Sequence, residues 1–409
     1  MSSRFRRPGP RPVGAEVPGE PVSLGGVEAA AGHDETDVLA DLRRYPDLEA
    51  PNLHAVDASD RLILDEAAPT LSRAGDGVVV IGDHHGALTL GAIARHGLSG
   101  VRTHQDRLLG ERALQVNAGR LGLSGFTQLG LTPELVHQAR VVLLQLPRSL
   151  DALDEIASLI AEHADPDVAV IAGGRVKHMT IAMNDVLGRH FTDVQARLAR
   201  QKSRVLVASR PRPAGQRWPK TEEHRDLRIT VCAHGGAFAG TGIDIGTRAL
   251  LQHLDAMPRD VAQAVDLGCG TGVLAALLAR ANEGLTVTAT DESAAAVASA
   301  RATVAANGLE GRVVVVRADG AETIPDASVD LVVLNPPFHV GAAVHDGVAR
   351  TLFAEAARVL TNGGELWAVW NSHLRYRPTL ERVVGPTRQV SRDPKFTVTV
   401  STRAAQRPI

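Results

Sequence analysis

A glycine-rich loop with an acidic residue at its start is the segment of this chain best suited to bind a ligand. Asp266, Gly268, Gly270 and Gly272 give it the form D-x-G-x-G-x-G, between a buried apolar run and a helical pattern. Glycines let a backbone turn tightly and approach a ligand closely. A dinucleotide-binding loop, G-x-G-x-x-G, would need a third glycine where this sequence has Val273. The loop therefore predicts a ligand site that is not the usual dinucleotide site.

Two further acids follow the next two expected strands. Asp291 closes a strand, where a carboxylate can accept hydrogen bonds from both hydroxyls of a ribose, and Asp319 follows the next strand, where it can meet an adenine amino group. Taken alone, Asp291 would suit a helix cap and Asp319 a turn before Gly320. The combination with the glycine loop favours a nucleoside site. Over the second half of the chain, this set resembles the class I S-adenosylmethionine-dependent methyltransferases.

Asn335, Pro336, Pro337 and Phe338 end the fourth expected strand of this half. An exocyclic aromatic amine is a poor nucleophile because its lone pair is delocalised into the ring. The Asn335 side-chain oxygen and the Pro336 carbonyl can each accept one of its N–H groups, which would orient the lone pair and favour the positive charge that develops on nitrogen. Phe338 offers a face for stacking a base. A purely structural turn is the less favoured interpretation, because the glycine loop precedes it in the correct order.

Both halves of the chain alternate buried apolar strands with helical stretches, as in a parallel α/β sheet. Ligands of such open sheets bind beyond the carboxyl ends of the strands, so the glycine loop, the two acids and the Asn-Pro-Pro-Phe segment are expected at one edge. The segments that carry the alternation are 76–97, 111–123, 140–147, 150–163 and 167–174 in the first half, and 264–280, 285–309, 311–320, 329–338 and 363–371 in the second.

The two halves are expected to be copies of one another, because three elements match in order at a nearly constant distance. The matched positions are Gly82 and Gly86 with Gly268 and Gly272, Asp106 with Asp291, and Gln145 with Asn335, at offsets of 186, 185 and 190 residues. The predicted fold class is therefore α/β, with two tandem Rossmann-like domains of the methyltransferase type. The predicted boundaries are a disordered tail at 1–35, a degenerate domain at 36–210, a basic linker at 211–230 and a catalytic domain at 231–409.

The first copy is expected to have lost the ligand site. Val80 stands where the second copy has Asp266, and His84 stands where it has Gly270. His84 and His85 are adjacent at this turn and could suggest a metal site, but no cysteine or set of nearby carboxylates completes such a site. We therefore interpret both histidines as turn residues. We predict instead that this half positions RNA.

The candidate phosphate contacts of the first half are Arg148, Arg175, Lys177 and the basic stretch 200–230, with a merely solvated basic surface as the alternative. The basic C-terminal stretch 371–409, with Trp370 and Tyr376 nearby, is a second candidate border of an RNA groove. Core packing is the alternative for one of the two tryptophans, Trp367 and Trp370.

Longer strings narrow the resemblance. NPPFH, GIDIGTRALLQHL, GGELWAVWNSHLRY and KFTVTVSTR, together with the duplicated first half, resemble the ribosomal RNA guanine-N2 methyltransferases, the large-subunit enzyme more closely than the small-subunit one. The resemblance runs from about residue 37 to the C-terminus. It implies S-adenosylmethionine as cofactor, ribosomal RNA or a ribosomal subunit as partner, and transfer of a methyl group to guanine N2.

The resemblance also implies roles for individual residues. His339 is expected to be structural, because methyl transfer from a sulfonium needs no strong base. The residues expected to hold guanine are Asn335, Pro336, Pro337 and Phe338. The residues expected to hold the cofactor are Asp266, Gly268, Gly270, Gly272, Asp291 and Asp319, with Phe238 and Asp244 to Gly246 closing its pocket.

Composition limits the other possibilities. The 409 residues carry a formal net charge of −2 and only two cysteines, Cys232 and Cys269, so we expect neither a disulfide framework nor a metal site. No run reaches the roughly 20 apolar residues that span a bilayer, and we expect a cytoplasmic protein. The enzymatic alternatives are methylation of adenine N6 or of a protein Gln. The non-enzymatic alternative is an RNA-binding or assembly factor, disfavoured because Asp266, Asp291 and Asn335 are all present.

Overall fold

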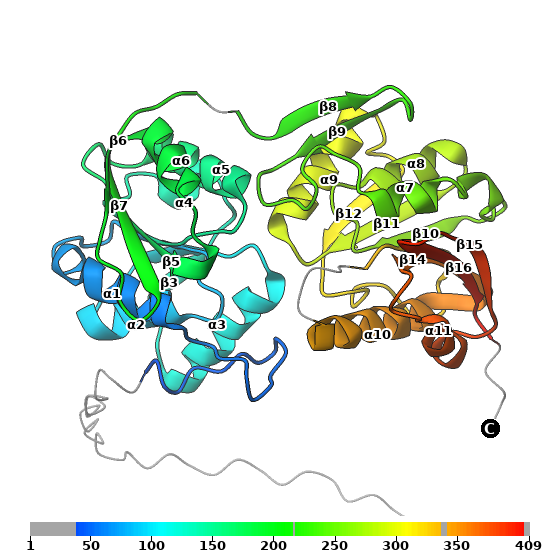
Figure 1. Cartoon of the computed structure of the whole chain (residues 1–409), viewed down its shortest axis with the longest axis horizontal. Coiled ribbons are helices and arrows are strands. Elements are labelled where there is room, and N and C mark those ends of the chain that lie inside the picture. The colour runs from blue at the N-terminus through cyan, green and yellow to red at the C-terminus, as the bar shows by residue number, and fades with distance from the viewer. Residues whose placement is uncertain (1–37, 216, 337–341, 405–409) are drawn as a thin grey trace, which may run out of the picture. The chain divides into compact units, whose positions relative to one another are not determined.

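The computed structural model describes residues 38–215, 217–336 and 342–404, which form two α/β lobes (Figure 1). Each lobe is built on a seven-stranded sheet with helices on both of its faces. The predicted fold class, two tandem Rossmann-like domains, is confirmed. The tail predicted at 1–35 lies outside the described residues.

The first lobe has the sheet order β3-β2-β1-β4-β5-β7-β6, in which β7 alone runs opposite to the other strands. Its strands are β1 (Val78–Ile81), β2 (Val101–His104), β3 (Phe126–Gln128), β4 (Val141–Gln145), β5 (Ala169–Arg175), β6 (Phe191–Ala196) and β7 (Ser203–Pro211). Its helices are α1 (Ala58–Leu71), α2 (Ala87–His96), α3 (Leu108–Leu121), α4 (Pro133–Val136), α5 (Leu150–His163), α6 (Ala182–His190) and the 3-10 turn η1 (Val176–His178).

The second lobe repeats this plan with the order β12-β11-β10-β13-β14-β16-β15. Its strands are β10 (Gln263–Leu267), β11 (Thr286–Asp291), β12 (Val313–Arg317), β13 (Val329–Leu334), β14 (Leu360–Asn371), β15 (Thr387–Arg392) and β16 (Phe396–Thr402). Its helices are α7 (Ile245–Leu251), α8 (Val273–Ala281), α9 (Ala294–Ala306), α10 (Ala342–Val359), α11 (Arg377–Val383) and the 3-10 turn η2 (Leu254–Ala256). Counted within each lobe, both orders are 3-2-1-4-5-7-6, as duplicated halves require.

Part of the segment predicted as a linker is folded. Strands β8 (Lys220–His224) and β9 (Ile229–Ala233) form an antiparallel hairpin within and just beyond residues 211–230. Ile229 and Val231 of this hairpin belong to the hydrophobic core of the second lobe. The chain therefore enters the second lobe through the hairpin.

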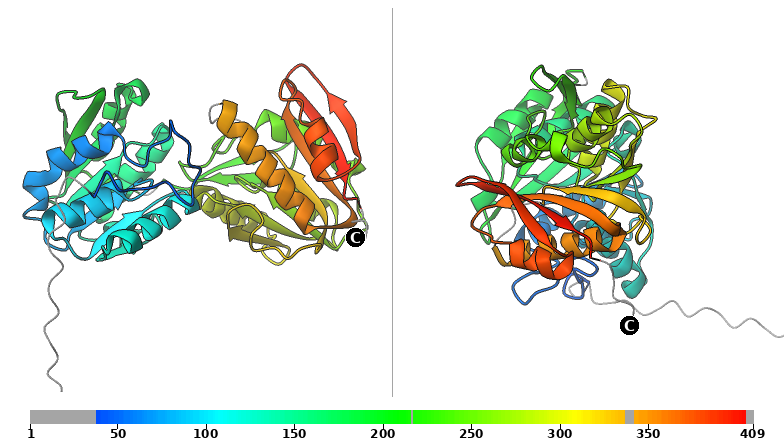
Figure 2. Two further views of the ribbon diagram at one scale, coloured as in Figure 1. Left: turned by 90° about the horizontal axis from the view of Figure 1, so that it is seen from below. Right: turned by 90° about the vertical axis from the view of Figure 1, so that its right-hand side faces the viewer.

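The central strands are buried on both faces, which explains their unbroken apolar runs. Val78 and Val80 pack with α1, α2 and α3, whereas Val79 and Ile81 pack with α4, α5 and α6 on the other face. The second lobe is covered in the same way by α7, α8 and α9 on one face and by α10 and α11 on the other (Figures 1 and 2). This two-sided cover leaves the carboxyl ends of the strands as the place for a site.

The two tryptophans of β14 pack on opposite faces of the second sheet. Trp367 is 1% exposed and Trp370 is 2% exposed, each in a different core cluster, and Tyr376 is buried against Trp370. Trp370 and Tyr376 are therefore not available to border an RNA groove, because both are buried in one core of the second lobe. The basic stretch 371–409 as such a border stays a prediction. Among the described residues, no helix is long and apolar enough to cross a membrane.

Candidate active site

The predicted site segments follow neighbouring strands of the second sheet. Leu267 of β10 pairs with Thr290 of β11 on one side and with Leu334 of β13 on the other. The residues that come next along these three strands are the glycine loop, Asp291 and Asn335. The topology therefore brings together side chains that lie far apart in the sequence.

The glycine loop makes a turn that needs glycine for two different reasons. Gly268, Gly270 and Gly272 all have positive φ, at 74°, 54° and 77°. A Cβ added at Gly268 or Gly270 would meet nothing within 4 Å, whereas one at Gly272 would lie 3.1 Å from the Cα of Ala300. The first two glycines leave open space above the loop for a ligand, and the third lets α8 begin close against α9.

The Asp291 carboxylate ties the glycine loop to the end of β11. Its Oδ2 accepts a hydrogen bond from the Gly270 amide at 3.0 Å, and its Oδ1 accepts one from the Ser293 amide at 2.9 Å. Burial raises the pKa of Asp291 to about 6, although these two amide hydrogen bonds lower it. A carboxylate has about four lone-pair sites, so Asp291 can hold the loop and still accept hydroxyl donors.

Asp266 lies beneath the loop and is only 1% exposed. Its Oδ2 accepts a hydrogen bond from the Ala275 amide of α8 at 2.9 Å, and its Oδ1 has no partner among the described residues. Burial raises the pKa of Asp266 to about 7. Within the described chain it therefore supports the start of α8, and its contact with a cofactor stays a prediction.

Asn335 is held by one end of its amide and has an unpartnered acceptor at the other. Its Nδ2 donates to Asp244 Oδ2 at 2.9 Å and to Thr247 Oγ1 at 3.0 Å. Its Oδ1 is buried without a partner among the described residues. A Cβ at Gly246 would come within 3.1 Å of that oxygen, so glycine leaves room beside it. This amide can accept a hydrogen bond from an incoming donor without reorienting.

The remaining predicted residues lie in different settings. Phe238 is 56% exposed and lies in the turn between β9 and α7. Asp319 follows β12 with its side chain largely exposed, and the part of its carboxylate that is removed from water, together with the charge of Glu322, raises its pKa. Pro337, Phe338 and His339 lie outside the described residues.

Asp244 and Thr247 meet at the start of α7 and both contact Asn335. Asp244 caps α7 by accepting from the Thr247 amide at 3.2 Å and also accepts from Asn335, and its contact with a cofactor stays a prediction. Thr247 was not singled out at all. The spacing of an N-cap Asp and a Thr three residues later could have marked both as a pair at a helix start.

The first lobe uses the equivalent turn differently. The Asp83 carboxylate accepts hydrogen bonds from the amides of Gly86, Leu88 and Thr89 at the start of α2. Those donors are therefore occupied by the protein itself. Gln145, the counterpart of Asn335, donates from Nε2 to Asp60 Oδ1 at 2.6 Å. These contacts support the prediction that this lobe has lost its ligand site.

Two family models match the chain, one in each lobe. They are the RLMG N-terminal domain at residues 33–212 and the methyltransferase small domain at residues 228–400. Ribosomal RNA large subunit methyltransferase G of Pseudomonas putida (strain GB-1) is 35% identical over 365 residues, which cover 88% of this chain and 96% of that protein. The protein of the same name from Streptomyces coelicolor is 36% identical over 368 residues, with coverages of 87% and 96%.

The chain belongs to the ribosomal RNA large subunit methyltransferase G family. The family predicted from the sequence is thereby confirmed, with the large-subunit enzyme as the better match. A solved 16S rRNA N2 methyltransferase of T. thermophilus, RsmC, in complex with AdoMet and guanosine, has the same two-lobed fold. It superposes with a TM-score of 0.66 at 22% identity and covers 87% of this chain and 97% of that one.

The basic residues predicted in the first lobe of this family member come together at one place. Arg148 lies after β4, Arg175 ends β5 and Lys177 follows in η1. Arg148 Nη2 is 3.5 Å from His178 Nε2. Burial, and then the charges of Arg148, Lys177 and Arg175, lower the pKa of His178. The three cationic side chains and the His178 imidazole thus lie together at the carboxyl ends of β4 and β5, and we call these four residues the basic cluster.

Proposed function

We propose that this protein transfers a methyl group from S-adenosylmethionine to the exocyclic N2 of a guanine in ribosomal RNA. The observation that carries the proposal is Asn335, whose Nδ2 is fixed by two partners while its buried Oδ1 has none among the described residues. An amine that must present its lone pair needs such an acceptor. The names of the family and of the solved neighbour support the substrate class.

The residues around the glycine loop fit the cofactor. Gly268 and Gly270 have open space where a Cβ would project, and the Asp291 carboxylate beside them can accept hydroxyl donors. When bound, S-adenosylmethionine supplies an electrophilic methyl group on a sulfonium. Asp291 would hold its ribose, with Asp319 at its adenine and Phe238 beside the pocket.

Asn335 and Pro336 would hold the guanine. The Asn335 Oδ1 and the Pro336 carbonyl would each accept one N–H of the exocyclic amine, which turns its lone pair toward the methyl donor. An acceptor that is already oriented stabilises the charge that develops on nitrogen without a reorganisation cost. Phe338 would stack on the base, and no general base is required of His339.

The first lobe would position the RNA through the basic cluster. Lys177 and His178 are exposed there, so phosphates can reach them. Contacts to phosphate fix register on an RNA and leave the choice of base to the second lobe.

The test is to incubate the full chain with radiolabelled S-adenosylmethionine and, separately, protein-free ribosomal RNA, each ribosomal subunit and a total protein extract. Labelled nucleosides are then identified by mass spectrometry. We expect N2-methylguanosine, and we expect Asn335→Ala to lower kcat by about 100-fold, as loss of an oriented hydrogen-bond partner does elsewhere. Thr361→Val serves as a neutral control. It removes a hydroxyl that donates to Asp330 at the amino end of β14, the opposite end of the sheet from Asn335.

Each outcome decides a different part of the proposal. Label on adenosine or on protein Gln would overturn the guanine substrate while keeping the cofactor. Cofactor binding that leaves no substrate labelled would overturn the proposed substrates. Absence of cofactor binding would favour an RNA-binding or assembly factor.

A further inference from the structure

We propose that two acids of the first lobe, Asp106 and Glu155, are positioning residues for two segments of the second lobe. These segments are residues 291–295 and residues 234–238, and we call them the cofactor loops. The inference rests on the proposed cofactor. The inference gives the degenerate lobe a second task besides RNA positioning. Without the contacts of Asp106 and Glu155, the cofactor loops of the second lobe would be less well ordered. Both lobes belong to one compact unit of the chain.

Asp106 is joined to the segment that follows Asp291. Its Oδ1 accepts hydrogen bonds from Ser293 Oγ and from the Ala295 amide, both at 2.9 Å, and its carbonyl accepts one from the Ala294 amide at 2.8 Å. Ser293 in turn donates its amide to Asp291 Oδ1 at 2.9 Å. One first-lobe side chain therefore fixes the residue that orients the predicted ribose-binding carboxylate.

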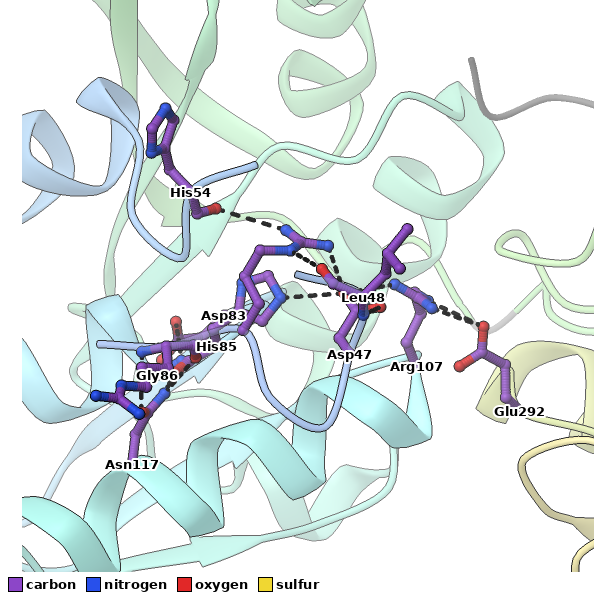
Figure 3. Close-up of polar contacts among 11 residues, drawn as sticks. Asp47, Leu48, His54, Asp83, His85, Gly86, Arg107, Asn117 and Glu292 are labelled. Atoms are coloured by element: carbon purple, nitrogen blue, oxygen red, sulfur yellow. Dashed lines mark hydrogen bonds and ion pairs between the residues drawn. The ribbon is translucent and has the colours of Figure 1, made fainter. Parts of the chain in front are cut away.

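A second pair of contacts strengthens this junction. Arg107 and Ser293 form an antiparallel bridge, in which the Leu108 amide donates to the Glu292 carbonyl at 3.0 Å. Arg107 also donates from Nε and Nη2 to Glu292 Oε1 at 3.0 and 2.9 Å (Figure 3). The residue next to Asp291 is thus held through both its backbone and its side chain.

Arg107 is itself anchored inside the first lobe. Its Nη1 lies 3.2 Å from Asp47 Oδ2, which also meets Arg44 at 2.6 Å and His85 at 3.2 Å (Figure 3). Burial alone would raise the pKa of Asp47, but the hydrogen bond with His85 and the charges of Arg107 and Arg44 hold it well below its usual value. This ionised, 7% exposed carboxylate is a rigid support for Arg107.

Glu155 binds the start of the turn that carries Phe238, which is predicted to close the cofactor pocket. It lies on α5 and is 7% exposed, and its two oxygens meet His234 Nδ1 at 2.5 Å and the Gly235 amide at 2.7 Å. A Cβ at Gly235 would lie 2.2 Å from the Asp151 carbonyl oxygen, so the two backbones touch there. The turn that carries Phe238 begins at this point.

These contacts reach the predicted cofactor loops but not the base-holding residue. Among the described residues, the side-chain hydrogen bonds of Asn335 go to Asp244 and Thr247, both in the second lobe. Asp106 is moreover the counterpart of Asp291 in the duplicated sequence. The acid that occupies the ribose position in one copy supports the ribose loop of the other.

The test compares four variants of the full chain: Asp106→Ala, Asp106→Asn, Glu155→Gln and Asp151→Asn. Asp151→Asn is the control. It removes an exposed ion pair with Lys220, which joins α5 to the β8–β9 hairpin. Among the described residues, no hydrogen bond or ion pair joins the Asp151 side chain to either cofactor loop. Calorimetry measures the Kd for S-adenosylmethionine, and steady-state kinetics separate the KM for cofactor, the KM for RNA and kcat. Hydrogen exchange follows the amides of residues 293–295, and thermal unfolding verifies folding.

We expect Asp106→Ala to raise the cofactor Kd and KM about tenfold, with kcat and the RNA KM changed less than about twofold. Asp106→Asn keeps an Oδ1 acceptor and should restore most of the affinity, Glu155→Gln should be intermediate, and Asp151→Asn should match the wild type. Exchange at 293–295 should accelerate in Asp106→Ala alone.

An unchanged cofactor Kd in a folded Asp106→Ala variant would overturn the inference. Equal losses in Asp106→Ala and Asp151→Asn would also overturn it, because they would indicate mere adhesion between lobes. If Asp106→Ala does not fold, Glu155→Gln is compared with Asp151→Asn instead. A weaker cofactor affinity in Glu155→Gln alone would support the inference, and equal affinities in the two variants would overturn it. A wild type that binds no cofactor would overturn the proposed function, and the exchange data would still judge the loop positioning.

Discussion

Asn335 shows how a single amide can be prepared for its task by its neighbours. Asp244 and Thr247 both accept from its Nδ2. A flipped amide would lose the hydrogen bond to Asp244 and place its oxygen against that carboxylate, which cannot donate. Its Oδ1 is consequently kept as the acceptor. At the residue scale, the chemistry depends on these partners as much as on Asn335 itself.

Replacing Thr247 tests this orientation. Thr247→Val keeps the shape but removes the Oγ1 acceptor, which frees one side of the Asn335 amide. Because a lost hydrogen bond costs about 1 kcal/mol, we expect kcat to fall about five- to tenfold while the cofactor Kd is unchanged. Single-turnover methylation and calorimetry measure the two quantities. An equal loss in Thr361→Val would refute the specific role.

The protonation of Asp291 predicts a pH dependence of cofactor binding. Its raised pKa, about 6, means that the carboxylate is ionised at pH 8 and protonated at pH 5. Since we propose that the ionised form accepts both ribose hydroxyls, affinity should be constant above pH 7 and fall toward tenfold per pH unit below pH 6. Titration of S-adenosylhomocysteine between pH 5 and 8 measures this. Asp291→Asn should bind weakly at every pH, and a flat wild-type profile would contradict the assignment.

The turn between β10 and α8 is the element on which the site depends. Its glycines share positive φ, but only Gly272 is crowded, by Ala300 of α9. Positive φ is required for the turn, whereas small size is required for the contact between α8 and α9. The two requirements can be separated by experiment.

Gly268→Ala and Gly272→Ala form a matched pair at nearly equal φ. We expect Gly268→Ala to lower the free energy of unfolding by about 1 kcal/mol through φ alone, and to weaken cofactor binding because its Cβ enters the open space. Gly272→Ala should lose about 1–3 kcal/mol more through crowding. Urea unfolding and calorimetry compare them, and equal unfolding losses would contradict the separation.

The whole molecule divides its work between two copies of one fold. One lobe retains the glycine loop and Asn335, while the other fills its own turn with Asp83 and carries the basic cluster. In the functions that we propose, the contacts of Asp106 and Glu155 make the two tasks interdependent.

The basic cluster predicts a salt-dependent affinity for RNA. Lys177→Gln should weaken ribosomal RNA binding and reduce the slope of log K against log salt by about 0.7, the value for one phosphate contact on a single strand. The cofactor Kd should be unchanged, because no hydrogen bond or ion pair joins the Lys177 side chain to a cofactor loop within the described part of the chain. Filter binding at several salt concentrations measures the slope. An unaltered slope would place the RNA on another surface.

Local patterns in the sequence are sufficient to predict the fold class and the duplication, and the segments that they mark as a candidate site follow neighbouring strands of one sheet. Apolar runs, glycine spacing and the Asn-Pro-Pro-Phe string are short-range signals, and α5 spans 150–163 as its pattern indicates. Those signals could not identify the partners of Asn335, the burial of Trp370 or the contacts of Asp106, because each joins segments distant along the chain. By itself the sequence determined which residues are available for the chemistry. Only the tertiary structure decided that the Asn335 side-chain oxygen has no partner among the described residues and that Asp106 of the first lobe binds Ser293 and Ala295 of the second, because hydrogen bonds between distant segments exist only once the chain has folded.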